Sequence, residues 1–328
     1  MRIAFAISNA ELVQETWTTT HLACRALEGG HTVLFIEPRD LEITARGQLV
    51  ARAAIVEQPT PRAALAAALA GRSVPRRYVG LLTCDLLLLR LNPLPESLLN
   101  LLLIAEDQGL RMVNPPGGVL RTRSKAWLAT LTDVPRPPTL ITHSRATARL
   151  FAGNLGGPIV VKPVLSSGGR GVTRVDPHAL DAVEDAMTRA QDIAPGPVVL
   201  QGWLPEATEG EKRLVWMDGE ILGGYLRRSP PGDFRHNLRV GGLPEPCEIG
   251  PSDRALGAAL TPHLLAAGIR IAGLDVIGRQ LVEVNTLNPG GVHYAEHFQA
   301  PSSLPPVGVE ILRRLTARRE PFREVRPA

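Results

Sequence analysis

A lysine and a glycine- and serine-rich loop come together near the middle of the chain. Lys162 lies in a predicted strand over residues 159–163, and the loop over residues 166–171 reads Ser-Ser-Gly-Gly-Arg-Gly. Such a loop can direct its backbone N–H groups at phosphate oxygens, because no Cβ atom blocks the approach. The alternative is an ordinary flexible hairpin, which a glycine-rich loop taken alone favours.

The scarcity of lysine favours phosphate binding over the plain hairpin. The chain has 33 arginines but only three lysines, at positions 125, 162 and 212. Where arginine supplies nearly every surface cation, a retained lysine indicates a position that needs a compact, rotatable ammonium group. Phosphate oxygens provide such a position, so we expect Lys162 to contact the same phosphates as the loop.

Two carboxylates and an amide are predicted on one face of a β-hairpin. Strands over 273–278 and 280–285, joined by a three-residue turn, place Asp275 opposite Glu283, and Asn285 shares their face. Carboxylates held this close repel each other unless a cation lies between them, and hard oxygen donors suit Mg²⁺. The alternative is a polar solvent face, which the apolar neighbours of these residues make the weaker interpretation.

The elements that must position these groups begin with an α/β pattern. Residues 2–7 and 32–37 are predicted strands that flank a helix over 17–28, and the same order recurs within residues 86–113. Two successive β-α-β units predict a parallel sheet. Residues 8–16 contain no glycine, so the Gly-x-Gly-x-x-Gly turn of a dinucleotide-binding oxidoreductase is absent.

Breaks rich in proline and glycine divide the chain into three predicted parts. Residues 1–118 form the α/β domain, which ends at the run Pro-Pro-Gly-Gly. Residues 119–202 form a small α+β unit that contains the glycine-rich loop. Residues 203–328 form a second α+β unit with the carboxylate hairpin, and its basic tail over 313–326 is expected to be a solvated last helix.

The composition is that of a folded protein with an ordinary surface. Of 328 residues, 44% are hydrophobic and 21% are charged, which excludes a disordered chain and suffices for two or three domains. A formal charge of +4 is too small to indicate nucleic-acid binding. No apolar run reaches the roughly 18 to 20 residues of a membrane span. Three cysteines without a Cys-x-x-Cys pair argue against disulfides or zinc, so we expect a cytoplasmic protein.

In the order and spacing of its motifs the chain resembles the ATP-grasp ligases, most closely bacterial glutathione synthetase. The residues that carry this resemblance are Lys125, Lys162 with its loop, Gln201 to Pro205, Glu209 to Arg213, Asp275, Glu283 and Asn285. The similarity covers almost the whole chain and is strongest from about residue 158 to residue 290. It implies the α/β ATP-grasp fold, in which an N-terminal parallel-sheet domain precedes two α+β subdomains that sandwich ATP.

The resemblance also implies a role for each matched residue. The two central lysines hold the ATP phosphates, the loop covers them, and the segment 201–204 reads adenine through its backbone while Glu211 binds ribose. The expected ATP-binding residues are Lys125, Lys162, Ser166, Ser167, Gly168, Gly169, Gln201, Gly202, Trp203, Leu204 and Glu211. The expected metal ligands are Asp275, Glu283 and Asn285, and the expected cationic clamps are Arg213, Arg228 and Arg235. Substrate contacts are expected from Arg90, Asn237, Asn288, Gly290 and Gly291.

The reaction implied is ATP-dependent ligation of a carboxylate to an amine through an acyl phosphate. It needs no covalent enzyme intermediate, and the sequence offers no nucleophile–base pair. Cations and metal ligands instead stabilise the transferring phosphoryl group. We expect ATP and two Mg²⁺ ions as cofactors, with Mn²⁺ as an alternative metal. We also expect small-molecule substrates and a homo-oligomer, either a dimer or a tetramer.

The chain departs from the family where the substrates would bind. Arg90-Leu91-Asn92-Pro93 replaces a basic and an acidic residue before paired prolines. Glu15 or Thr16, followed by Trp17-Thr18-Thr19, replaces a Lys-Asp-Ser-Ser motif, and residues 286–291 replace a hydroxyl-rich turn. We therefore expect a product other than glutathione, made from an N-acylated or peptide-like donor and a small amino acid. A true glutathione synthetase, and an ATP-binding regulatory protein without turnover, stay open as alternatives.

Overall fold

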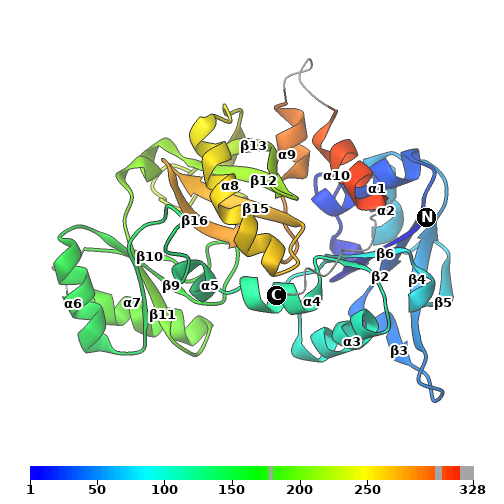
Figure 1. Ribbon diagram of the computed structural model, residues 1–328, viewed down its shortest axis with the longest axis horizontal. Helices are drawn as coiled ribbons and strands as arrows, with labels where there is room; N and C mark the ends of the chain where they lie inside the picture. Colours follow the sequence, from blue (N-terminus) through cyan, green and yellow to red (C-terminus); the bar gives the residue numbers. More distant parts are fainter. Residues whose placement is uncertain (177–179, 300–304, 318–328) are drawn as a thin grey trace, which may run out of the picture.

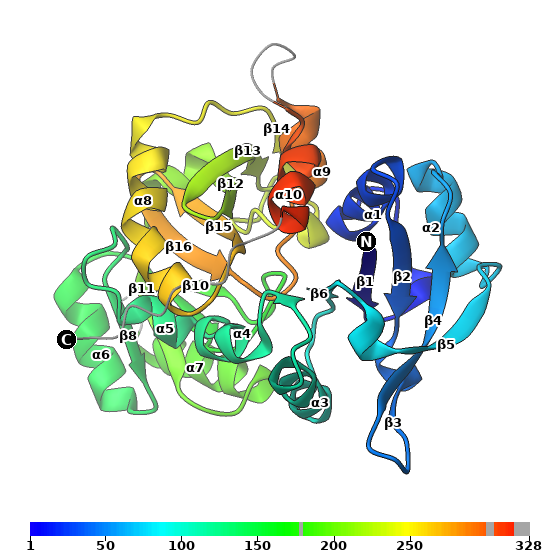
Figure 2. The ribbon, with the colours of Figure 1, turned by 45° about the vertical axis from the view of Figure 1, so that its right-hand side comes forward.

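Three β-sheets follow one another along the chain. The computed structural model describes residues 1–176, 180–299 and 305–317, and its sheets have seven, four and five strands. The first sheet lies at one end of the molecule, and the other two lie together with their helices at the opposite end (Figures 1 and 2). None of the helices in the described ranges combines the length and apolar composition needed to cross a bilayer.

The first sheet is mixed, with strand order β3-β4-β2-β1-β6-β7 and β5 paired to β4. Its strands are β1 (Arg2–Ile7), β2 (Thr32–Ile36), β3 (Leu41–Ile43), β4 (Leu49–Val56), β5 (Arg76–Gly80), β6 (Leu86–Arg90) and β7 (Met112–Val113). The predicted parallel pairing is confirmed for β2, β1, β6 and β7. It is wrong for β3, β4 and β5, which pair antiparallel. For β3 and β4 the reason is the connecting segment, because residues 44–48 are too few for a crossover.

Helices cover both faces of this sheet. Side chains alternate along β1, so that Ile3 and Phe5 pack on one face while Ala4 and Ala6 pack on the other. The first face is covered by α1 (Thr18–Glu28), α2 (Arg62–Ala70) and, from the end of the chain, α10 (Val307–Thr316). The second face is covered by α3 (Glu96–Asp107). The packing of α10 beside α1 joins the C-terminal part of the chain to the first sheet (Figure 1).

The second sheet carries the glycine-rich loop. Its strand order is β10-β9-β11-β8, all antiparallel, and α6 (Arg145–Leu155) and α7 (Leu180–Ile193) pack against it. The strands are β8 (Thr139–Thr142), β9 (Ile159–Pro163), β10 (Thr173–Val175) and β11 (Val198–Gly202). The loop joins β9 to β10. The predicted start of α7 at residue 179 lies outside the described residues.

The third sheet carries the carboxylate hairpin. Its order is β14-β13-β12-β15-β16, and α8 (Pro251–Ala266) packs on the face that buries Trp216. The strands are β12 (Glu211–Met217), β13 (Glu220–Arg228), β14 (Leu243–Glu245), β15 (Ile271–Ile277) and β16 (Gln280–Asn285).

Shorter helices connect and flank these sheets. They are α4 (Pro116–Thr122), α5 (Lys125–Ala129), α9 (Val292–His297) and 3₁₀ turns at Ala10–Leu12, Pro38–Asp40, Leu81–Thr83, Pro205–Glu209 and Leu238–Val240. The domain divisions near residues 118 and 202 stay predictions. The first residues of the predicted basic tail, 313–316, form the end of α10. Residues 318–328 lie outside the described ranges.

Candidate active site

The predicted pairing of the two carboxylates is confirmed, although the turn differs from the expected one. Asp275 of β15 lies opposite Glu283 of β16. Ile277 pairs with Gln280, so the turn has two residues and not three, and the register shifts between Asp275 and Val276. This β-bulge inserts one extra residue into β16, and that extra residue restores the register which a three-residue turn would have given.

Asp275 is buried and faces two arginines. Its Oδ1 lies 2.6 Å from Arg213 Nε and 2.8 Å from Arg227 Nη2, and its Oδ2 accepts a 3.1 Å hydrogen bond from Asn285 Nδ2. Burial alone would raise the pKa of Asp275, but Arg213 and Arg227 bring it below its ordinary value. The carboxylate therefore stays ionised inside the protein.

Glu283 faces the lysines instead. Its Oε1 lies 3.4 Å from Lys125 Nζ, which also donates a 3.0 Å hydrogen bond to the Ser166 carbonyl. Lys162 is buried and donates a 2.8 Å hydrogen bond to Gln201 Oε1, and burial lowers the pKa of Lys162 to about 8 against the opposing effect of Glu283. The expected repulsion between the two carboxylates is thus corrected, because each of them has its own cationic neighbours.

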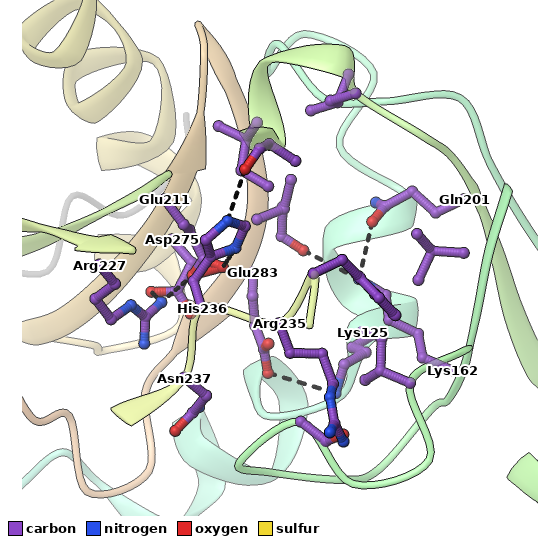
Figure 3. A pocket seen from close by; sticks show the side chains of 18 of the residues that line it. Lys125, Lys162, Gln201, Glu211, Arg227, Arg235, His236, Asn237, Asp275 and Glu283 are labelled. Carbon is purple, nitrogen blue, oxygen red and sulfur yellow. Dashed lines mark hydrogen bonds and ion pairs between the residues drawn. The ribbon is translucent and has the colours of Figure 1, made fainter. Parts of the chain in front are cut away.

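A first cavity, open to solvent, lies between the second and third sheets. Lys162 and Gln201 approach it from one side, while Glu211, Arg227 and Asp275 approach it from the other (Figure 3). Every residue expected to bind ATP lines this cavity: Lys125, Lys162, Ser166, Ser167, Gly168, Gly169, Gln201, Gly202, Trp203, Leu204 and Glu211.

In the segment expected to bind adenine, residues 201–204, one backbone N–H group is available to a ligand. Gly202 N–H donates to Pro138 O and Trp203 N–H donates to Pro158 O, each at 2.9 Å. Within the described ranges Leu204 N–H makes no hydrogen bond. The Trp203 ring, 5.8 Å from that of Phe234, adds an apolar edge to the same end of the cavity.

Glu211 is held in place by Arg227 and lies beside His236. Arg227 Nη2 donates to its Oε1, and His236 Nδ1 lies 3.6 Å from its Oε2. His236 is buried and places Nε2 2.7 Å from Ala207 O, so Nε2 carries the proton. Burial lowers the pKa of His236, and the ring stays neutral at pH 7.

The glycine-rich loop has a backbone that only glycine adopts readily. Gly168, Gly169 and Gly171 have φ values of 71°, 75° and 71°. A Cβ atom at Gly171 would also lie 2.7 Å from the side chain of Ile193. Arg235 Nη1 donates to Gly169 O at 3.4 Å, so the loop meets the segment that follows β13.

A second, larger cavity adjoins the first. Arg213 lines it, and so does every residue expected to contact substrate: Arg90, Asn237, Asn288, Gly290 and Gly291. Four residues line both cavities, namely Ser167, Gly168, Arg227 and Asn237. The two cavities therefore share a wall beside Asp275.

One predicted clamp is corrected by the structure. Arg228 is exposed, binds Glu245 at 2.7 Å, and lines neither cavity. Arg227 lines both and was missed, because both faces of β13 carry apolar residues and alternation could not choose between adjacent arginines. Arg235 lines the first cavity and binds Asp233 at 2.6 Å, while Arg213 lines the second.

The carboxylate hairpin has a donor set that fits magnesium. Asp275, Glu283 and Asn285 offer oxygen ligands only, and the Asn285 amide uses its nitrogen on Asp275, which leaves its oxygen for a metal. No group of three or more His, Cys, Asp or Glu side chains that could hold a metal occurs in the described part of the chain. Phosphate and water would complete such a site, as Mg²⁺ favours.

Comparisons with known proteins agree with this geometry. Residues 125–300 match the family described as prokaryotic glutathione synthetase, ATP-grasp domain. The glutathione synthetase of Parasynechococcus marenigrum (strain WH8102) is 33% identical over 312 residues, which span 91% of this chain and 94% of that protein.

Solved structures show the same fold at low sequence identity. The D-cycloserine synthetase DcsG matches with a TM-score of 0.64 at 17% identity, over 95% of this chain and 99% of that one. The ATP-grasp ligase PsnB, complexed with a minimal precursor, matches with a TM-score of 0.57 at 15% identity, over 95% and 99% of the two chains. The family uses ATP and a divalent metal. The chain thus belongs to the prokaryotic glutathione synthetase family and is an ATP-grasp carboxylate–amine ligase.

Proposed function

We propose that ATP binds in the first cavity, that the carboxylate and the amine bind in the second, and that they react at the shared wall. The observation that carries this proposal is that Ser167, Gly168, Arg227 and Asn237 line both cavities beside Asp275. A γ-phosphoryl group held there would face the second cavity directly. Proximity of this kind supplies a large part of a ligation rate.

Each step has residues to support it. Lys125, Lys162 and the glycine-rich loop hold the phosphates in the first cavity. The substrate carboxylate attacks the γ-phosphorus, the bond to the β-phosphate oxygen breaks, and ADP leaves. The amine then attacks the acyl carbon of the acyl phosphate, loses a proton, and phosphate departs with one former carboxylate oxygen. Arg213 and Arg227 face the oxygens that gain charge in both steps.

Asp275, Glu283 and Asn285 are proposed to hold the metal. A bound Mg²⁺ supplies charge stabilisation at the phosphoryl oxygens. We propose two Mg²⁺ ions, replaceable by Mn²⁺, because the set provides two carboxylates on adjacent strands and hard oxygen donors suit either metal.

Glu211 and the segment 201–204 are proposed to bind the nucleoside. Leu204 N–H is the available donor for an adenine ring nitrogen, and Trp203 lines the same end of the cavity. Glu211, fixed by Arg227, is placed to accept hydrogen bonds from ribose hydroxyls.

The substrates are proposed to differ from γ-glutamylcysteine and glycine. The second cavity is lined by Asn92, Asn288, Gly290 and Gly291, which lie in segments that depart from the family pattern. We propose an N-acylated or peptide-like donor and a small amino acid as the amine.

The compartment and the assembly are also proposals. Burial raises the pKa of both Cys24 and Cys84 to about 11, and Cys24, Cys84 and Cys247 are free thiols, which supports a reducing cytoplasm. A dimer or tetramer stays a prediction, which light scattering on the purified protein tests.

The test of the proposed function is phosphate release from Mg-ATP in a matrix of carboxylates and amines. We expect release that requires one member of each class together. γ-Glutamylcysteine with glycine is one combination in the matrix, and efficient glutathione formation would overturn the proposed difference in substrates. Release that needs neither partner, or none with any pair, would contradict the ligase assignment.

A further inference from the structure

The second cavity is cationic and has no carboxylate in its wall. Its lining includes Arg90, Arg213, Arg227 and Arg239, and no Asp or Glu occurs among its described lining residues. Arg213 and Arg227 are balanced by Asp275 and Glu211, which line the first cavity. Positive charge without a partner is therefore left elsewhere in the cavity.

Arg90 is the buried cation that lacks a counter-ion. It is 6% exposed, and the other buried arginines (Arg213, Arg227 and Arg270) each bind an aspartate. Arg90 Nε donates to Thr19 Oγ1 at 3.2 Å and Nη1 donates to Pro289 O at 2.8 Å, both neutral acceptors. Its Nη2 has no hydrogen bond or ion pair in the described part of the chain. Burial lowers the pKa of Arg90 to about 9, with no carboxylate to oppose the effect.

The first turn of α1 adds backbone donors at the same place. The N-cap residue Trp17 makes no capping bond, and the first turn has no acidic residue. The threonine hydroxyls that could cap the helix are used elsewhere, since Thr18 Oγ1 accepts from Gly291 N and Thr20 Oγ1 donates to Gln14 O. The positive end of this 11-residue helix thus faces the cavity that Trp17 and Thr18 line.

A buried guanidinium and an uncapped helix start together are complementary to an anion. Burying an arginine without a charged partner costs desolvation free energy. A ligand carboxylate would offset this free energy by accepting a hydrogen bond from the unused Nη2. The first-turn N–H groups would bind its second oxygen. A free ammonium group of a substrate would find no carboxylate in this wall.

We propose that Arg90 and the first turn of α1 form a subsite for a carboxylate of a substrate that does not itself react. This inference rests on the proposed function, in which the substrates occupy the second cavity. A donor with two carboxylates would then place one at Arg90 and the other at Arg213 and Arg227. Alternatively, the carboxylate bound at Arg90 belongs to the amine substrate.

Calorimetry with matched probes tests the subsite. N-Acetyl-L-glutamate and N-acetyl-L-glutamine differ by one carboxylate and lack an ammonium group, and glycine with glycinamide forms the second pair. We expect the carboxylate member of one pair to bind about 10 to 150 times more tightly, the range for charge-assisted hydrogen bonds. The first pair assigns the subsite to the donor, and the second assigns it to the amine.

Two variants locate the effect. Arg90→Gln is expected to reduce the preference for the carboxylate probe over its amide partner to about twofold or less. Arg239→Gln removes an exposed arginine of the same cavity and is expected to keep most of that preference. Arg90→Lys, expected to retain part of the preference, serves if the glutamine variant does not fold. Equal loss in the variants at positions 90 and 239 would overturn the subsite.

The result on the wild-type protein also separates this inference from the proposed function. Mg-ADP is titrated in parallel. A protein that binds Mg-ADP but prefers neither carboxylate probe overturns the subsite alone. A protein that shows the Arg90-dependent preference without binding Mg-ADP supports the subsite and overturns the proposed nucleotide role of the first cavity.

Discussion

Arg227 Nη2 lies 2.8 Å from Asp275 Oδ1, and Arg227 lines both cavities. The same guanidinium also contacts Glu211. It therefore joins a carboxylate proposed to bind metal to one proposed to bind ribose, at the wall where the phosphoryl group would be transferred. Arg228, the next residue along β13, binds Glu245 at the surface.

This arrangement predicts opposite results for two adjacent arginines. Arg227→Gln is expected to lower kcat by about 10²- to 10³-fold, the effect typical of losing a donor that stabilises developing charge. Arg228→Gln is expected to stay within about twofold of wild type, as for other surface changes. Steady-state kinetics measures both, and a circular dichroism spectrum verifies that each variant is folded. Equal losses would show that Arg227 has no special place in the reaction.

Lys162 predicts a pH dependence of nucleotide binding. Its lowered pKa of about 8 means that the free protein carries this charge below pH 8 and loses it above. The affinity for Mg-ADP should therefore fall as pH rises from about 8 to 9.5, by up to about tenfold per pH unit once the free lysine is deprotonated. Calorimetric titrations at several pH values test this.

The matched control is Lys162→Arg, which keeps its charge throughout that range. We expect its affinity to change much less with pH. If the arginine variant shows the same slope as wild type, another group causes the pH dependence and Lys162 is not the titrating phosphate ligand.

The two carboxylates of the hairpin should differ in their effect on stability. Asp275→Asn leaves Arg213 and Arg227 buried without their shared carboxylate and is expected to cost about 3–5 kcal/mol. Glu283→Gln is expected to cost only about 1 kcal/mol or less, because Glu283 is more exposed and Lys125 keeps its bond to Ser166. Turnover should collapse in both variants. Urea unfolding ranks them, and the reverse order would contradict the charge pairing described.

The glycine-rich loop should become protected when nucleotide binds. Arg170 is exposed at its tip, and the loop has little apolar surface to hold it in place. Trypsin cleavage after Arg170 is expected to slow when Mg-ATP is added. Arg46, exposed in the turn between β3 and β4 and lining neither cavity, provides an internal control. Unchanged cleavage at Arg170 would count against a covering role.

The sequence predicted the parts of the fold that are encoded locally. Apolar runs and glycine stops predicted β1, α1 and β2, and alternation placed Asp275 opposite Glu283. The antiparallel pairing of β3, β4 and β5 was missed, because β4 pairs with β2 and β5, which lie far from it along the chain. The bulge in β16 was missed for a related reason, since it is defined by the pairing with β15.

The candidate site was predicted by residue type more completely than by geometry. Every residue expected to bind ATP lines one cavity, because those positions were taken from the resemblance to a family whose fold brings them together. The contact of Arg227 with Asp275 crosses from β13 to β15, which both pair with β12. Nothing in the order of residues along the chain reveals that contact. The subsite at Arg90 and α1 likewise joins segments about 70 residues apart.

Transfer of oxygen from the donor carboxylate to phosphate distinguishes ligation through an acyl phosphate from other routes to the amide. The protein is incubated with Mg-ATP, an amine pool and ¹⁸O-labelled carboxylic acids, including γ-glutamylcysteine and N-acetyl-L-glutamate. Mass spectrometry then examines the released phosphate. Ligation through an acyl phosphate is expected to give one ¹⁸O atom per released phosphate, in step with amide formation. Unlabelled phosphate alongside amide formation, or release of pyrophosphate, would contradict an acyl-phosphate ligation at the wall shared by the two cavities.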